Sequence, residues 1–145
     1  MSRAALMLAC TPALASCQLG VDVKVTGPPS APVFELAEAG WLGGDPPALG
    51  GLTVETETGP GTWKTVWSVS RDGGCEATAR IAYGRVPPGF VAAGPAAAIE
   101  AGRAYQVYVL GCGYSGGAWF KPLADRIAYA PGIGDAPRRT VEAAR

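Results

Sequence analysis

The chain has 145 residues with 12 basic and 12 acidic side chains, and it contains no histidine. The balanced charge provides no basic surface for nucleic acid or for an anionic membrane, so neither is indicated as a partner. The missing histidine excludes catalytic and metal sites that need an imidazole, and we expect no cofactor and no bound metal. The length fits one domain with a hydrophobic core.

Residues 1–16 have the organisation of an export signal. Arg3 provides a cationic start, and an apolar run extends from Ala4 to Ala15 before small residues follow. The run has 12 residues, whereas about 20 are needed to cross a hydrocarbon core of about 30 Å. We therefore predict a cleaved signal peptide and not a transmembrane helix.

The motif Leu14-Ala15-Ser16-Cys17 follows the apolar run and resembles the lipobox of bacterial lipoproteins. This resemblance implies that Cys17 carries the lipid anchor and that residues 17–20 form a short tether. The alternative is an A-x-A site at Ala13-Leu14-Ala15, where ordinary signal peptidase would release a soluble protein beginning at Ser16. Lipidation is favoured because it leaves two cysteines able to pair, whereas ordinary cleavage leaves three in an oxidising compartment.

Residues 21–130 are the predicted folded domain, in which apolar residues recur with a period of two. Clusters of Gly and Pro interrupt this pattern every eight to fifteen residues, which is typical of short strands joined by turns. We predict an all-β domain of about seven to eight strands, with one helical turn at residues 96–100 and a mobile tail at residues 131–145. The expected strands are 21–25, 33–37, 52–58, 62–70, 76–84, 104–111, 117–121 and 126–129.

The strand expected at residues 62–70 carries two of the four tryptophans. Its alternation places Trp63, Thr65, Trp67 and Val69 on one face. We expect this face to enter the core, with both tryptophans buried there.

The segment Ile99 to Val107 contains a turn at Gly102, followed by Tyr105 at the start of a strand. It resembles the tyrosine corner of fibronectin type III and related immunoglobulin-like sandwiches, in which the Tyr hydroxyl forms a hydrogen bond back across the turn. The resemblance spans residues 50–121 and implies a single sandwich of that kind. The stretch Tyr83 to Phe90, followed by Gly102 to Val109, also looks like small proteobacterial lipoproteins of unassigned function, which implies no activity.

Cys75 and Cys112 both lie in Gly-rich loops between expected strands. In the fibronectin-like order these loops emerge at the same end of the sandwich, which implies a structural disulfide. Such a bond closes a loop of about 38 residues and stabilises the fold by about 3 to 4 kcal/mol in the chain-entropy account. The alternatives are a redox pair or metal ligands, for which the chain lacks a C-x-x-C motif and a histidine.

The second of these loops also matches two motifs of enzymes. Gly113 to Gly117 satisfies G-x-S-x-G, in which Ser115 would be the nucleophile and Lys64 or Lys121 the base. Gly111 to Gly116 satisfies G-x-G-x-x-G, a phosphate-binding pattern when a helix follows the loop. A strand is expected on each side of the loop, so we interpret the glycines as those of a wide hairpin turn.

Other side chains are weaker candidates for a binding role. Glu55 and Glu57 alternate with Thr, as on a solvated strand face, and no segment supplies the close oxygen ligands of a calcium site. Exposed aromatic side chains beside the Gly-rich loops are candidates for stacking against a sugar or a protein. The possible ligand contacts are Trp41, Tyr114, Ser115 and Trp119.

The sequence therefore predicts an exported, lipid-anchored cell-envelope protein, held in a bacterial membrane and facing the periplasm. The outer membrane is favoured if the cell is Gram-negative. The expected role is that of a binding or structural module without catalysis, with an envelope protein or glycan as partner. The alternatives are a small envelope hydrolase using Ser115, or an inhibitor of a cell-wall enzyme.

Overall fold

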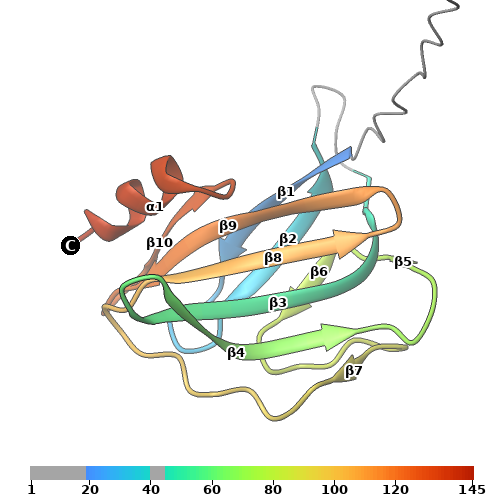
Figure 1. The fold of residues 1–145 in the computed structure, drawn as a ribbon, viewed down its shortest axis with the longest axis horizontal. Coiled ribbons are helices and arrows are strands. Elements are labelled where there is room, and N and C mark those ends of the chain that lie inside the picture. The colour runs from blue at the N-terminus through green and yellow to red at the C-terminus, as the bar shows by residue number, and fades with distance from the viewer. Residues whose placement is uncertain (1–18, 40–44) are drawn as a thin grey trace, which may run out of the picture.

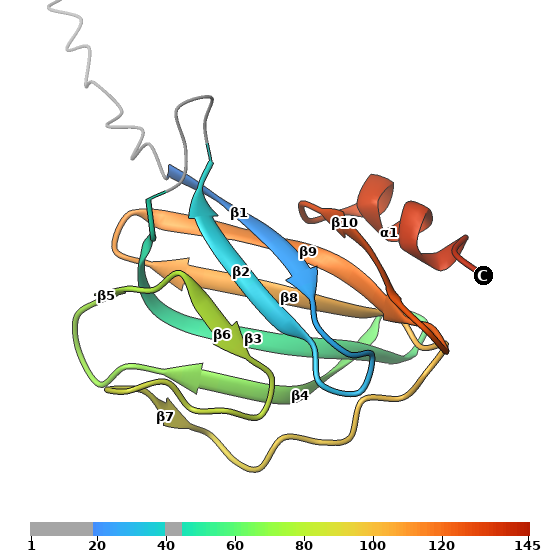
Figure 2. The ribbon, with the colours of Figure 1, turned by 180° about the vertical axis from the view of Figure 1, so that it is seen from behind.

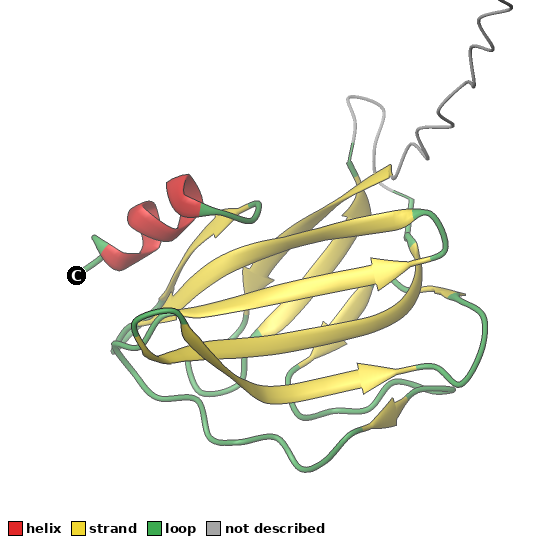
Figure 3. Ribbon diagram, in the orientation of Figure 1, coloured by secondary structure: helices red, strands yellow, loops and turns green. Residues whose placement is uncertain are grey.

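The computed structural model describes residues 19–39 and 45–145. The predicted signal peptide, the lipidation site Cys17 and the candidate contact Trp41 lie outside the described residues. The described chain is almost entirely β-structure with one helix near its C-terminus (Figure 3). Its elements are β1 (Leu19–Thr26), β2 (Val33–Glu38), β3 (Ala48–Gly59), β4 (Thr62–Ser70), β5 (Glu76–Ala77), β6 (Arg80–Ala82), β7 (Val91–Ala92), β8 (Tyr105–Gly111), β9 (Tyr114–Pro122), β10 (Ile127–Pro131) and α1 (Asp135–Glu142).

The strands form one ten-stranded sheet in the order β6-β2-β1-β9-β8-β3-β4-β7, with β10 on β9 and β5 on β3. This sheet curls into a half-barrel with two layers that face each other (Figures 1 and 2). Strands β6, β2 and β1 form the back layer, and strands β9, β8, β3 and β4 form the front layer. Strand β1 joins the layers because it pairs antiparallel with β2 and parallel with β9. The all-β, sandwich-like fold predicted from the sequence is confirmed.

Two differences explain why the structure has ten strands whereas the sequence predicted about seven to eight. The strand expected at residues 76–84 is divided into β5 and β6, because the chain leaves β3 there and crosses to β2. Strand β7 was not expected, and it pairs with the end of β4. Residues 96–100 contain no helical turn, since the N–H of Ala97 donates instead to the carbonyl of Val66 at 3.0 Å.

The core lies between the two layers and consists of their inward-facing alternate side chains. Phe34 of β2 packs edge-on against Phe120 of β9, with ring centroids 5.7 Å apart. Tyr105 of β8 stacks on the same Phe120 ring at 5.2 Å. These aromatic contacts connect the back layer to the front layer through a continuous apolar interior.

The hydrogen bond expected at the tyrosine corner is present. The backbone N–H of Glu100 donates to the Tyr105 hydroxyl at 2.8 Å, which ties the turn before β8 to the core. A second buried tyrosine, Tyr83, donates to the carbonyl of Ala97 at 2.7 Å and holds the segment after β7. Burial raises the pKa of Tyr83 to about 12, with a smaller contribution from Tyr105.

The expectation that Trp63 and Trp67 share a buried face is wrong. The register between β3 and β4 shifts after Val54, so Val54 faces Trp67 while the next residue, Glu55, faces Thr65. This β-bulge inserts one extra residue in β4 and reverses the alternation of side chains beyond it. Trp67 consequently points into the core, whereas Trp63 lies on the outer face of the sheet.

The tail after residue 131 also differs from the expectation, because it contains α1. The helix packs beside β10 and β9, at the edge of the front layer (Figure 1). Val141 is its buried residue and lies against Trp119 and Ala130. None of the helices within residues 19–39 and 45–145 has the length and hydropathy required to cross a bilayer.

The start of β1 lies beside the hairpin that joins β8 to β9. The N–H of Leu19 donates to the carbonyl of Gly113 at 2.8 Å, and Leu19 is in register with Tyr114. Residue 19 and the loop that contains Cys112 therefore share one end of the molecule.

Candidate functional site

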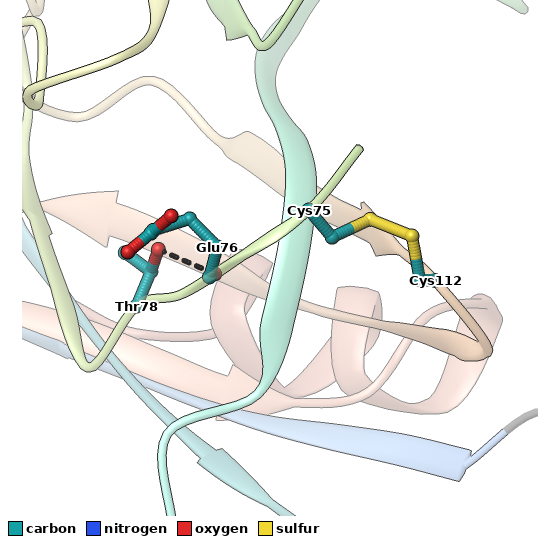
Figure 4. Close-up of a disulfide and its surroundings, with 4 residues drawn as sticks. All are labelled: Cys75, Glu76, Thr78 and Cys112. Carbon is teal, nitrogen blue, oxygen red and sulfur yellow. Dashed lines mark hydrogen bonds between the residues drawn. A yellow bond between two sulfur atoms is a disulfide. The ribbon is translucent and has the colours of Figure 1, made fainter. Parts of the chain in front are cut away.

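The predicted pair Cys75 and Cys112 forms a disulfide, with a Cα–Cα separation of 5.9 Å across 37 residues of sequence (Figure 4). It connects the segment before β5 to the turn after β8. A Cβ atom placed on Gly50 would lie 3.5 Å from the Cys75 sulfur, so the disulfide passes directly over β3. The bond therefore holds three neighbouring parts of the front layer together at the end where β1 begins.

A shallow groove lies beside the disulfide on the outer face of the front layer. Its volume is about 420 Å³, and Gly50 and Gly51 form its floor, where the missing side chains leave backbone at the surface. Tyr108 and Leu110 of β8 line one side, and Ser68 of β4 lines the other. Burial raises the pKa of the Tyr108 hydroxyl, and the nearby Glu55 carboxylate raises it further.

Leu110 separates this groove from a second hollow of about 320 Å³, which is lined by Tyr108, Ser115 and Ile133. The Leu110 side chain is 62% exposed and that of Ile133 is 46% exposed. An extended strand next to the disulfide thus presents a large apolar side chain to solvent between two depressions. We name the surface made by Tyr108, Leu110 and Ile133 the apolar patch.

The glycines of the two enzyme-like motifs have a packing role. A Cβ atom on Gly116 would overlap the backbone of Val21, because β1 approaches β9 closely there. A Cβ atom on Gly117 would overlap both the carbonyl oxygen of Val107 and the side chain of Ile133. Glycine at these positions permits strand β1 and the segment after β10 to lie against β9.

Ser115 lies within β9, in register with Leu110 of β8, so the G-x-S-x-G stretch belongs to a hairpin and not to a strand-to-helix turn. Lys121 is six residues further along the same strand, which corresponds to about 20 Å. Lys64 faces Thr56 on β3, at the opposite end of the sheet. Neither lysine is placed to take a proton from Ser115.

Tyr114 occupies a different position from the other candidate contacts. Its hydroxyl donates a hydrogen bond to the Glu38 carboxylate, which connects the start of β9 to the end of β2. This hydrogen bond is the main cause that raises the pKa of Tyr114, followed by burial. The contact joins the two layers near the beginning of β1.

Trp119 is buried, at 4% exposure, and the expectation that it is exposed is wrong. Helix α1 covers it, and its ring lies edge-on to that of Trp63 with centroids 5.4 Å apart. The Arg138 guanidinium lies over both rings, 5.6 Å from the Trp63 centroid and 5.5 Å from that of Trp119. Arg138 also forms an ion pair with Glu57 of β3. We name these four residues the tryptophan clamp.

The carboxylates of β3 are hydrogen-bonded on the outer face. Glu55 accepts hydrogen bonds from Gln106 Nε2 at 3.0 Å and from Thr65 at 3.4 Å. Arg138 pairs with Glu57 and, through its Nε, with Glu142 at 2.8 Å. In the part of the chain that the structure describes, no three or more Cys, Asp or Glu side chains gather as metal ligands would.

Sequence reasoning missed both surface features. The apolar patch combines two residues of β8 with Ile133, which only the fold after β10 brings alongside. The helix had a usable signal, because Arg138 and Glu142 have the i, i+4 spacing of a helical ion pair. The bulge in β4, which turns Trp63 outward, leaves no comparable mark on the pattern of residues.

Comparison with known proteins adds no functional information. No protein-family model, curated protein or solved structure matches the chain.

Proposed function

We propose that this protein is a lipid-anchored envelope protein that binds a partner protein through the apolar patch. The observation that carries this proposal is the exposure of Leu110, which is held at 62% exposure near the disulfide-braced end of β8. Exposed apolar side chains that form a contiguous patch with neighbouring depressions mark protein contact surfaces. The mainly apolar character of the patch favours a protein over a glycan.

The position of the patch relative to the N-terminus favours a partner at the membrane surface. Only Gln18 separates Cys17 from Leu19, the first residue of β1, and the two extended residue steps from Cys17 to Leu19 span about 7 Å. Leu19 contacts Gly113, and Gly113 lies in the same hairpin as Leu110. A lipid on Cys17 would therefore hold the patch close to the bilayer, where an integral or peripheral envelope protein can reach it.

Mass spectrometry of the mature protein tests the anchor. We expect an N-terminal Cys17 that carries acyl chains. A mature protein that begins with an unmodified Ser16 would overturn the anchor and leave the apolar patch to be tested separately.

Photo-crosslinking in intact cells tests the patch. A photoreactive amino acid at position 110 should give a discrete crosslink to one envelope protein. The matched control is position 91, because Val91 is 63% exposed and lies on edge strand β7. The same product from both positions, no product from position 110, or a crosslink to glycan would contradict the proposal.

Co-purification of the crosslinked partner provides the second test. Leu110→Ser should abolish recovery of that partner, and Val91→Ser should retain it. Trp119→Ala is not a suitable variant for this test, since Trp119 is buried beneath α1 and its loss would disturb the fold.

The two alternative functions make different predictions. An inhibitor would use the same surface, and the identity of the crosslinked partner as a cell-wall enzyme would reveal it. A hydrolase would depend on Ser115, yet neither lysine proposed as its base lies near that residue. We therefore place binding ahead of catalysis.

A further inference from the structure

The tryptophan clamp is a preformed site that holds a cation, although the cation is supplied by the chain itself. Two indole rings and the Glu57 carboxylate of the sheet surround the Arg138 guanidinium, which also pairs with Glu142 of its own helix. A guanidinium is planar, weakly hydrated and permanently charged, so it suits both the aromatic faces and the carboxylate. Trp63, Trp119 and Glu57 come from β4, β9 and β3, and their placement is set by the sheet.

One polar atom of the clamp is left unsatisfied. Trp119 is only 4% exposed, and within the described residues its indole Nε1 has no hydrogen-bond partner. A buried donor without an acceptor costs free energy and points to a group that is not supplied by the folded chain. A peptide that presents an arginine also carries backbone carbonyls, which are acceptors of the required kind.

The element that fills the clamp is weakly attached. Helix α1 has eight residues, a length at which a helix in water depends on packing for its stability. Val141 is its buried residue, and the other ties are polar, including Lys121 Nζ to the carbonyl of Ala144 at 2.8 Å. Such a segment belongs to the part of a structure that opens locally at low cost.

The segment that connects β10 to α1 also permits the helix to move as a unit. Gly132 and Gly134 precede the helix with φ values of 101° and 111°, a region of backbone conformation that favours glycine. The structure between β10 and α1 thus contains two residues with wide conformational freedom. The N–H of Gly132 donates to the carbonyl of Gly117 in β9 at 2.8 Å, so Gly134 is the position at which helix α1 can rotate out of the clamp while the ten-stranded sheet remains intact.

We propose that the tryptophan clamp is a binding site for an arginine side chain of a partner polypeptide, and that Arg138 is an internal ligand which this arginine replaces. Displacement of α1 exposes the indole rings of Trp63 and Trp119 and the Glu57 carboxylate together. The clamp is separate from the apolar patch, so it does not depend on that surface having a partner.

The test uses the full chain in detergent micelles and a capped Ala-Arg-Ala peptide as probe. Its readout is the NMR signals of the indole N–H groups of Trp63 and Trp119, with Trp67 as the internal control because it lies in the core. The matched control peptide replaces arginine with citrulline, which has nearly the same shape and no charge.

In the Arg138→Ala variant we expect the arginine peptide to shift the Trp63 and Trp119 signals saturably and to leave Trp67 unchanged. The citrulline peptide should give no saturable shift. Adding Glu57→Gln should weaken binding at least about fivefold, since one charge partner is lost. The wild-type chain should bind the peptide at least about tenfold more weakly than Arg138→Ala, because the internal ligand competes.

Three results would overturn the proposal. They are an absence of saturable binding to Arg138→Ala, an equal response to citrulline, and a wild-type chain that does not respond at one hundred times the concentration that saturates the variant. If Arg138→Ala loses the folded Trp67 signal, Arg138→Gln replaces it. In the wild-type chain, hydrogen exchange of the α1 amides must also accelerate when the peptide binds, which a merely structural Arg138 would not produce.

Discussion

Replacing Gly116 by alanine tests the closest approach between the two layers. The new Cβ atom would lie 2.9 Å from the carbonyl carbon and from the Cβ of Val21, and it would overlap the carbonyl oxygen. These are mainly backbone atoms of β1, which cannot move aside by changing a rotamer. Relief requires β1 to separate from β9 over the four paired residues Leu19 to Asp22.

We expect Gly116→Ala to lower the free energy of unfolding by about 3 kcal/mol, at the upper end of the usual cost of overpacking. Two glycines provide controls of the same chemical change. Gly113 has a φ of 80° and open space around it, so alanine there should cost about 1 kcal/mol from backbone strain alone. Gly94 has open space and no positive φ, so its alanine variant should lie within about 0.5 kcal/mol of wild type.

Urea unfolding of the oxidised protein, monitored by tryptophan fluorescence, measures the three variants. The comparison is valid if the dependence of the free energy on urea stays constant among them. A Gly116→Ala protein as stable as Gly94→Ala would refute the reasoning, because it would mean that β1 does not lie against β9 as described.

Three further changes follow from the same structure. Replacing Cys75 and Cys112 by serine should lower the free energy of unfolding by about 4 kcal/mol, from the entropy of closing the loop. Equal urea midpoints of the wild-type protein with and without reductant would contradict this. Val141→Ala should remove about 2 kcal/mol of local stability and red-shift the fluorescence of Trp119, whereas an unchanged emission would show that α1 does not cover that ring. Tyr83 has a pKa raised by burial from 10.0 to about 12; the unfolded chain therefore releases this proton first, so stability is kept below pH 10 and falls as the pH rises from about 10 to about 12. Urea denaturation at increasing pH should show a smaller loss of the free energy of unfolding in Tyr83→Phe than in the wild-type protein.

The glycines of the β8–β9 hairpin illustrate how a motif acquires its meaning from its surroundings. Read alone, Gly113 to Gly117 matches a nucleophile elbow, and the overlapping stretch matches a phosphate loop. In the fold, Gly116 and Gly117 are the places where β1 and Ile133 come against β9. The requirement is steric, since any side chain there would occupy the space of a neighbouring backbone.

The two proposed surfaces lie at different positions on the front layer. The apolar patch is next to the disulfide and to the start of β1. The tryptophan clamp is at residues paired near the opposite end of β3, where Glu57 faces Trp63. A partner could therefore occupy one of them without contacting the other, and the experiments above distinguish the two.

Much of the fold was predictable from local patterns. The period of two indicated strands because alternate residues of a strand face opposite sides, and it located β1, β2, β4, β8 and β9. The turn before Tyr105 predicted a hydrogen bond across it, which is formed by Glu100. The two Gly-rich loops with cysteines predicted the disulfide, because local turn chemistry and cysteine pairing are both visible in the sequence.

What only the tertiary structure decided depends on contacts between residues far apart in the chain. One extra residue in β4 reversed the direction of Trp63, and a bulge of this kind is set by the pairing with β3 and not by the residue types. Helix α1 is stabilised by Trp119 and the charges of β3, which its own short sequence cannot reveal. The sequence by itself indicated most of the strands and the disulfide, and it predicts an export signal, since these depend on local residue patterns and on the small number of cysteines. The candidate surfaces depend on strands that meet only after folding, which is why neither was visible beforehand.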